Sequence, residues 1–479
     1  MYKLQQIKRH YSLYIIRKKE NRHITQRKSE VMKEQFRNDT PINYEVVQSV
    51  INQLNLPSVG NASIREIKKI IDMIEKQTGN KFIRMEMGIP GLKPPTIGTE
   101  AEIQALRNGV AAIYPDIDGN HELKNEIARF VKNFLNIEVN PDACIPTVGS
   151  MQGSFAAFLT LARLDANRDT TLFIDPGFPV HKQQHKVLGQ KFESFDVYDY
   201  RGEKLRDKLE SYFKTGKIHS VLYSNPNNPS WICFTEEELR IIGELANKYD
   251  VVICEDLAYF GMDFRHDYSI PGQPPYQPSV ANYTDNYILF ISSSKVFSYA
   301  GQRIGMMVIS NKLFAKKSSH LLNYYSSDIF GRAMIFGTVY ALSSGTAHSA
   351  QYALTAMLKA ANDGNFNFLE EVKIYADKAH TMKQLFLNNG FHIVYDKDID
   401  KPVADGFYFT IAYPGFSGVE LIEELFYYGI SAISLSITGS TRTEGLRACV
   451  SLVNPSQFPD LELRLKKFSE HHALVSNPA

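Results

Sequence analysis

The sequence predicts an α/β protein whose larger part is built on a mostly parallel β-sheet. Short apolar and β-branched runs recur from about residue 143, namely TLFID (171–175), SVLYS (220–224), DVVICED (250–256), YILFI (287–291) and GMMVIS (305–310). They lack strict apolar–polar alternation, which is typical of strands buried on both faces. Helical patterns separate them, and regular strand–helix–strand alternation implies parallel pairing. Ligands of such sheets bind beyond the carboxyl ends of the strands.

Two helices have clear signals. Within residues 234–250, Thr235 and Glu238 have the spacing of a capping box, and apolar residues then recur every three or four positions. Residues 366–390 predict a long helix that ends near Gly390. Short strand-like segments and a further helix follow, which indicates a smaller α+β domain.

The chain is therefore expected to form two domains, the smaller one from both chain ends. Residues 43–80 are helical in pattern and are assigned to the smaller domain. The predicted divisions are a basic N-terminal extension (1–41), an N-terminal arm with part of the small domain (42–100), a large cofactor-binding domain (101–360) and a small C-terminal domain (361–479).

The composition is that of an ordinary globular protein. The 479 residues carry a formal net charge of +1, so no general affinity for nucleic acid or membranes is expected. No apolar run reaches the ~18–20 residues of a membrane span. The four cysteines are scattered without a CxxC pair, so we expect a reduced, cytoplasmic protein without a metal site.

The N-terminal segment differs from the rest of the chain. Residues 1–31 hold nine Lys or Arg and two Glu. Such a segment is compatible with a transit peptide, with a nucleic-acid-binding arm, or with an unstructured extension that precedes a start at Met32. The third interpretation is favoured, because globular patterning begins only near residue 42.

The stretch SSSKVFSYAGQRIG (292–305) is the strongest candidate for a functional site. Lys295 follows a predicted strand directly, where a lysine can act as an amine nucleophile toward an aldehyde cofactor such as pyridoxal phosphate. This cofactor also needs a phosphate site, an anion for its pyridine nitrogen, donors for its phenolate oxygen and a ring to stack on. The motifs of dinucleotide-binding, P-loop, zinc-protease and serine-hydrolase sites are missing from the sequence.

Residues that meet each of these needs lie near the ends of the predicted strands or at the start of a helix. Asp256 is the candidate partner of the pyridine nitrogen, since a buried carboxylate keeps that nitrogen protonated. The other candidates are Tyr259 and Asn228 for the phenolate oxygen, Phe178 for stacking, and Ser292, Ser294, Arg303 and the helix start at Gly149–Ser150 for the phosphate.

In these motifs and their order the chain resembles the class I/II pyridoxal-phosphate-dependent aminotransferases of the aspartate aminotransferase superfamily, fold type I. The resemblance covers about residues 43–470. The matching segments are SSSKVFSYAGQRIG, NPNNP (225–229), EDLAY (255–259), DPGFP (175–179), VGSMQG (148–153), YPDIDGNHELKNEIARF (114–130), LRACVSL (446–452) and MEMGIPGLKPP (85–95).

The resemblance implies a seven-stranded sheet, a homodimer, and transfer of an amino group between an L-amino acid and a 2-oxo acid. It implies that Lys295 binds the cofactor covalently and shuttles protons. The roles given above for Asp256, Tyr259, Asn228 and Phe178 are also those of the family. The resemblance further assigns Ser292, Ser294, Arg303 and the Ser150–Met151 backbone to the phosphate, Tyr114 to the phosphate of a partner subunit, and Arg447, Gly88 and Asn228 to the substrate.

One departure and two other functions need consideration. The Thr-Gly that usually follows NPxNP is Ser230-Trp231 here, and a second arginine for dicarboxylate substrates has no clear counterpart, so aspartate specificity stays open. A β- or γ-eliminating lyase on the same fold is the main alternative to an aminotransferase. A cofactor-sensing transcription regulator is disfavoured, because the basic segment of 31 residues is too short for a DNA-binding domain.

Overall fold

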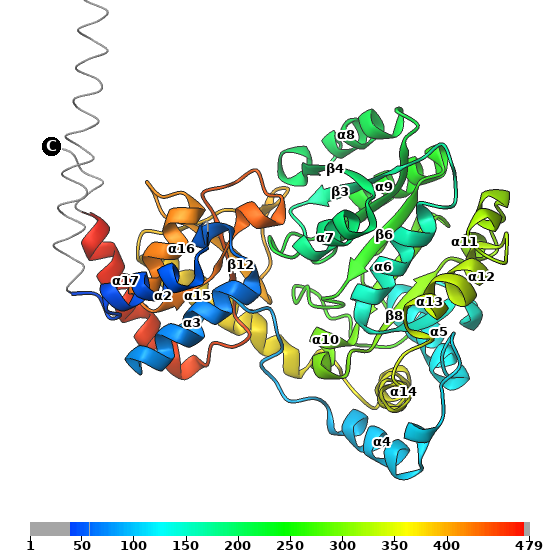
Figure 1. Ribbon diagram of the computed structural model, residues 1–479, viewed down its shortest axis with the longest axis horizontal. Helices are drawn as coiled ribbons and strands as arrows, with labels where there is room; N and C mark the ends of the chain where they lie inside the picture. The colour runs from blue at the N-terminus through cyan, green and yellow to red at the C-terminus, as the bar shows by residue number, and fades with distance from the viewer. Residues whose placement is uncertain (1–38, 57, 474–479) are drawn as a thin grey trace, which may run out of the picture.

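The computed structural model describes residues 39–56 and 58–473, which form two lobes (Figure 1). The predicted extension, residues 1–41, lies outside the described residues except for its last three. Among the described residues, no helix combines the length and the apolar character needed to cross a membrane. The predicted domain boundaries remain predictions.

The larger lobe contains the predicted sheet of seven mostly parallel strands. Its order is β2-β8-β7-β6-β5-β3-β4, and β8 runs antiparallel to both of its neighbours. The strands are β2 (Cys144–Thr147), β3 (Thr170–Asp175), β4 (Lys191–Asp196), β5 (Ile218–Ser224), β6 (Val252–Leu257), β7 (Tyr287–Ser292) and β8 (Gly305–Ile309). All five predicted strands are confirmed. The edge strand β4 escaped prediction because much of it is exposed, so its sequence lacks an apolar run.

Helices connect successive strands of this sheet (Figure 1). They are α6 (Gly149–Leu161), α7 (Pro179–Leu188), α8 (Lys204–Phe213) and α9 (Glu236–Tyr249). The capping box predicted for α9 is present, because Thr235 accepts from the Glu238 amide and the Glu238 carboxylate accepts from the Thr235 amide. Helix α14 (His348–Asn362) packs against α4 (Thr96–Arg107) and α5 (His121–Leu135). Shorter helices are α10 (Ser293–Val296), α11 (Asn311–Phe314), α12 (Phe330–Arg332) and α13 (Tyr340–Ser343), with a π-helix at Ala333–Val339 between the last two.

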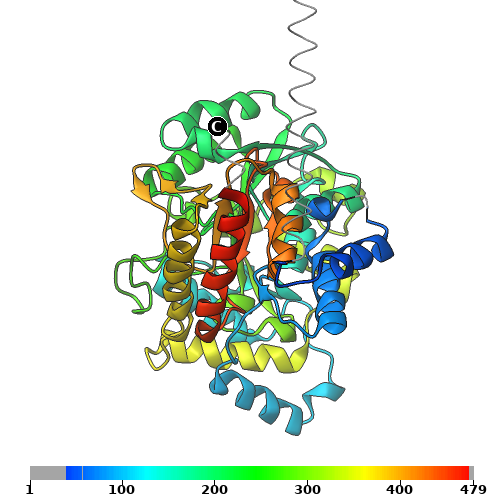
Figure 2. The same ribbon diagram turned by 90° about the vertical axis from the view of Figure 1, so that its left-hand side faces the viewer.

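The smaller lobe is built from both ends of the chain, as predicted. Figure 2 shows its C-terminal helices α15, α16 and α17 side by side, with the N-terminal helices α2 and α3 beside them. Their bounds are α2 (Tyr44–Leu54), α3 (Ile64–Thr78), α15 (Ile374–Asn388), α16 (Gly418–Tyr427) and α17 (Phe458–Ala473). The strands are β1 (Ile83–Arg84), β9 (His392–Ile393), β10 (Lys397–Asp398), β11 (Lys401–Pro402), β12 (Tyr408–Ala412), β13 (Ile430–Ser431), β14 (Ile433–Ser434) and β15 (Leu446–Cys449).

Strand pairing joins the two chain ends directly. Strand β1 pairs in parallel with β13, so the N-terminal segment is held by the C-terminal one. Strands β14, β15, β12 and β9 form an antiparallel sheet in that order.

The helix predicted for residues 366–390 is shorter than expected. Helix α15 begins only at Ile374, after a 3-10 turn at Glu371–Lys373. The side chain of Asn367 accepts a hydrogen bond from the Leu369 amide at 3.0 Å. This local bond competes with helix formation, since asparagine favours turns over helix interiors.

A buried carboxylate connects the lobes. Asp398, on the β10–β11 hairpin, accepts from Arg201 Nη1 at 3.2 Å and from Arg265 Nη2 at 2.9 Å. Tyr395 adds a second contact, because its hydroxyl donates to Asp196 Oδ2 at 2.6 Å. These polar contacts fix the two lobes to each other.

Trp231 fills the junction of the lobes. This tryptophan, the only one in the chain, is fully buried and has a φ of +63°. A Cβ atom at Gly406 would lie 2.1 Å from its Cε2 atom. The indole therefore needs a glycine at position 406.

We expect Gly406→Ala to lower the free energy of unfolding by about 1–3 kcal/mol, because the added methyl group overpacks the indole. Urea unfolding followed by circular dichroism measures this change. Gly301→Ala is the matched control, since a Cβ atom there meets nothing within 4 Å. Equal midpoints for the two variants would contradict the packing argument.

Candidate active site

The predicted catalytic residues converge at one edge of the large sheet. Lys295 lies in α10, directly after β7, and Asp256 lies near the end of β6. Asn228 follows β5, and Phe178 follows β3. Because β3, β5, β6 and β7 are neighbours and parallel, their carboxyl ends meet at the same edge.

The amine of Lys295 is prepared to act as a nucleophile. Burial lowers its pKa to about 8, and the positive charges of Arg447 and Arg303 act in the same direction. Its Nζ atom lies 5.9 Å from the centre of the Phe407 ring. A substantial fraction of this amine is therefore neutral near pH 7–8, as nucleophilic attack and proton transfer require.

The carboxyl group of Asp256 lies in a strongly desolvated position. Burial raises its pKa to about 7, although the Ala258 amide donates to Oδ1 at 3.2 Å and Lys295 is nearby. The other oxygen, Oδ2, lies 4.0 Å from His181 Nε2. Sequence reasoning missed His181, which lies one helical turn after Phe178 and contacts that ring edge to face.

The two residues predicted to donate to a phenolate oxygen each make one hydrogen bond to another side chain. The Tyr259 hydroxyl donates to the Tyr408 hydroxyl at 2.7 Å, and both side chains are buried. Asn228 Oδ1 accepts from Arg447 Nη1 at 3.4 Å. Sequence reasoning also missed Tyr408, because an apolar strand pattern does not show which residue reaches the site.

Arg447 is almost completely buried in β15 and stacks on an aromatic ring. Its guanidinium carbon lies 4.5 Å from the centre of the Tyr408 ring, and Nη2 donates to the Glu86 carbonyl oxygen at 2.6 Å. Its Nε atom has no hydrogen-bond partner among the described residues. A buried guanidinium with an unused donor fits a carboxylate ligand.

The predicted phosphate site, called the phosphate cradle below, is formed by Arg303, the N-terminus of α6 and two glycines, Gly149 and Gly305. Cβ atoms added at Gly149 and Gly305 would lie 2.6 Å from Arg303 Nη2 and 2.9 Å from the Ser150 amide nitrogen, respectively. These glycines let the guanidinium and the N-terminus of α6 approach each other. Ser150 is partly exposed at this helix start, and its neighbour Met151 is 40% exposed.

The serines around Lys295 have different partners. Ser292 Oγ accepts from the Ser294 amide at 3.1 Å and caps α10, which positions the lysine. Ser294, the residue before Lys295, is also buried. Gly88 lies against Tyr408, because a Cβ atom at residue 88 would be 2.0 Å from the tyrosine hydroxyl oxygen.

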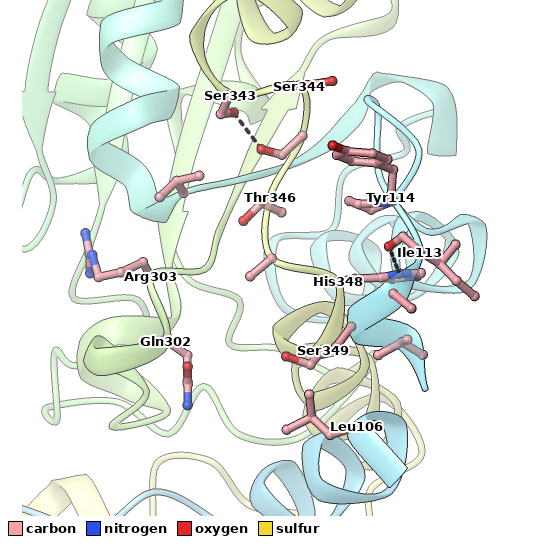
Figure 3. A pocket seen from close by; sticks show the side chains of 17 residues that line it. Leu106, Ile113, Tyr114, Gln302, Arg303, Ser343, Ser344, Thr346, His348 and Ser349 are labelled. Atoms are coloured by element: carbon pink, nitrogen blue, oxygen red, sulfur yellow. Dashed lines mark hydrogen bonds between the residues drawn. The ribbon is translucent and has the colours of Figure 1, made fainter. Parts of the chain in front are cut away.

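A cavity of about 730 Å³ adjoins the phosphate cradle. Figure 3 shows Arg303 and Tyr114 on opposite sides of this cavity. Tyr114 is 93% exposed at this cavity, which Arg303 also lines. The roles predicted for these residues remain predictions.

A family model described as aminotransferase class I and II matches residues 81–457. The chain belongs to this family. It is 26% identical to LL-diaminopimelate aminotransferase of Natranaerobius thermophilus over 67% of this chain and 76% of the relative. It is 29% identical to glutamate-pyruvate aminotransferase AlaC of Escherichia coli over 54% of this chain and 61% of the relative.

Solved structures show the same fold. Alanine aminotransferase from Pyrococcus furiosus superimposes with a TM-score of 0.69, at 21% identity over 86% of this chain and 98% of that chain. Aspartate aminotransferase from Thermotoga maritima superimposes with a TM-score of 0.67. The sequence identity is 19%, over 85% of this chain and 97% of that chain. The chain is thus a pyridoxal-phosphate-dependent aminotransferase of fold type I, and nothing in these comparisons supports the eliminating lyase.

The residues of this aminotransferase fit the family's cofactor. The glycine-walled cradle suits a phosphate dianion, since it combines a guanidinium with the N-terminus of α6. Lys295 and Asp256 lie on adjacent strand ends, and each affects the pKa of the other.

We expect Asp256→Asn to stabilise the cofactor-free protein at pH 8 by about 1–4 kcal/mol. The folded-state pKa of about 7 lies above the ordinary 3.8, so stability falls as pH rises through this window and the full cost is present above pH 7. Near pH 4 the variant and the wild type should unfold at similar urea concentrations. Asp267→Asn is the control, because hydrogen bonds from Ser269 lower the pKa of that carboxyl. An equal gain at both pH values would contradict the assignment.

Proposed function

We propose that this aminotransferase holds its amino-acid substrate between Lys295 and Arg447, in the cleft between the two lobes. The observation that carries this proposal is the Arg447–Asn228 hydrogen bond, which joins β15 of the small lobe to the loop after β5. The substrate carboxylate would bind Arg447, and its amino group would face Lys295. This arrangement would bring the α-carbon near the amine of Lys295, whose pKa burial lowers to about 8.

The cofactor contacts follow from the same geometry. Lys295 would bind the cofactor aldehyde, Asp256 its pyridine nitrogen, and Tyr259 and Asn228 its phenolate oxygen. Phe178 would stack on the ring, and the phosphate would lie among Ser292, Ser294, Arg303 and the Ser150–Met151 amides. When bound, pyridoxal phosphate supplies a carbonyl carbon that captures amines and a ring that accepts an electron pair.

Lys295 Nζ is the group that moves protons in this proposal. Its pKa of about 8 lets it accept the substrate α-proton and return it at a neighbouring carbon, because both proton states are accessible near neutral pH. Asp256 holds the proton of the ring nitrogen. Burial raises its pKa to about 7, and a protonated ring nitrogen would be a cationic partner that favours the carboxylate.

The assembly proposed for this protein is a homodimer. The exposed Tyr114 and Ile113 lie at the rim of the cavity that also contains Arg303, so a second subunit could cover this rim. Tyr114 would then reach the phosphate of the partner subunit. We further propose a cytoplasmic location, in keeping with four free, buried cysteines.

The first test is the absorbance of the protein mixed with pyridoxal phosphate. We expect a visible band that amino-acid donors bleach and 2-oxo acids restore. Borohydride should fix the cofactor to wild-type protein but not to Lys295→Ala. Lys378→Ala is the matched control, because burial also lowers the pKa of that lysine, whose amine donates to the Ser451 carbonyl oxygen. Loss of the visible band in Lys378→Ala but not in Lys295→Ala would contradict the proposed role of Lys295.

A second test concerns the substrate carboxylate. We expect Arg447→Lys to raise the amino-acid concentration needed for half bleaching by at least about 30-fold, because a lysine cannot reproduce the paired donors. The affinity for pyridoxal phosphate should change little. Arg442→Lys, which alters a contact with Asp199 outside the cleft, should behave as wild type. A similar change in both variants would refute the role of Arg447.

A further inference from the structure

Tyr408 lies where three candidate site groups meet. Its side chain is 1% exposed, and its hydroxyl is bonded to that of Tyr259 at 2.7 Å. Its ring carries the Arg447 guanidinium at 4.5 Å. Its hydroxyl also occupies the space beside Gly88. One phenol therefore touches groups proposed for the cofactor and for the substrate.

The position of this phenol is fixed by packing. In the register of β12 and β15, Tyr408 pairs with Cys449 and Thr410 pairs with Arg447, so tyrosine and arginine are diagonal neighbours on one face. Trp231 and Phe407 meet the ring edge to face, at centroid distances of 6.1 and 5.1 Å. These contacts hold the ring in the position from which its hydroxyl meets that of Tyr259.

The number of protons in the tyrosine pair limits its hydrogen bonds. Each hydroxyl has one proton to donate and can accept further bonds. Here the proton of Tyr259 points to Tyr408. If Tyr259 donates instead to the cofactor's phenolate oxygen, its own oxygen becomes free to accept the Tyr408 proton. The second bond strengthens the first, because a phenol that accepts a hydrogen bond is a better donor.

We propose that Tyr408 is a positioning residue that acts through Tyr259, donating to it when the cofactor is bound and so strengthening its bond to the phenolate oxygen. This inference rests on the proposed role of Tyr259. The same tyrosine supports the face of Arg447, so it links the grip on the substrate carboxylate to the cofactor. The charged and titratable groups that face the pair are Arg447 and Cys449, both on β15.

The test is a pH titration of visible absorbance with pyridoxal phosphate bound. A weaker donor at Tyr259 would leave the phenolate oxygen of the bound cofactor more basic. Tyr408→Phe should therefore raise the midpoint of the titration by about 0.3–1 pH unit. Tyr259→Phe should raise it at least as far. The double variant should titrate like Tyr259→Phe alone, because Tyr408 acts only through that hydroxyl.

Two controls separate the hydroxyl from packing. Tyr395→Phe also removes a buried, hydrogen-bonded hydroxyl from the small lobe, and its midpoint should equal that of the wild type. Trp231 contacts both Tyr259 and Tyr408 and is the only tryptophan, so its fluorescence reports whether the pocket stays packed. Its emission maximum should not move in Tyr408→Phe.

The outcomes are distinguishable. A shift with Tyr259→Phe but none with Tyr408→Phe would overturn the relay and leave the proposed function intact. No shift with Tyr259→Phe would overturn both the relay and the proposed role of Tyr259. A midpoint shift in Tyr408→Phe with a red-shifted Trp231 emission would assign the effect to packing and also reject the relay.

Discussion

The candidate active site depends on the contacts of the buried Arg447 guanidinium. An isolated guanidinium is costly to bury, so its surroundings must supply partners. They come from three parts of the chain: the Glu86 carbonyl, the Asn228 side chain and the Tyr408 ring. The contacts that join the two lobes therefore also hold the guanidinium that we propose binds the substrate carboxylate. The unpaired Nε atom leaves part of this requirement for the ligand to meet.

Several side chains of the candidate site can pack closely only because glycines lie next to them. Gly149 and Gly305 let Arg303 reach the start of α6, and Gly406 admits the indole of Trp231. The usual glycine after the NPxNP segment is replaced by this tryptophan, and Gly406 supplies the space. The departure from the family motif is thus accommodated by a glycine 175 positions later in the chain.

Two ionisable groups of the proposed cofactor site are costly to bury. Asp256 and Lys295 are both desolvated, and burial shifts the pKa of each so that its neutral form is favoured. The protonated ring nitrogen of the proposed cofactor would place a positive charge beside Asp256. Binding should then add to stability by mass action, since these contacts exist only in the folded state. Burial of Asp256 and Lys295 thus both lowers the stability of the protein locally and gives these groups the pKa values that the proposed function uses.

The amino-acid sequence by itself determined the sheet and the residues at its carboxyl edge. Lys295, Asp256 and Asn228 could be predicted because each lies near the carboxyl end of a buried strand whose apolar run is visible in the sequence. The edge strand β4 and the start of α15 were not predicted, since exposure and an asparagine side-chain bond outweigh residue patterns there. Only the tertiary structure decided that Tyr408 meets Tyr259, that Trp231 lies on Gly406 and that Asp398 joins the lobes. Those contacts connect residues 100 or more positions apart, and their partners are set by packing between lobes rather than by any local pattern.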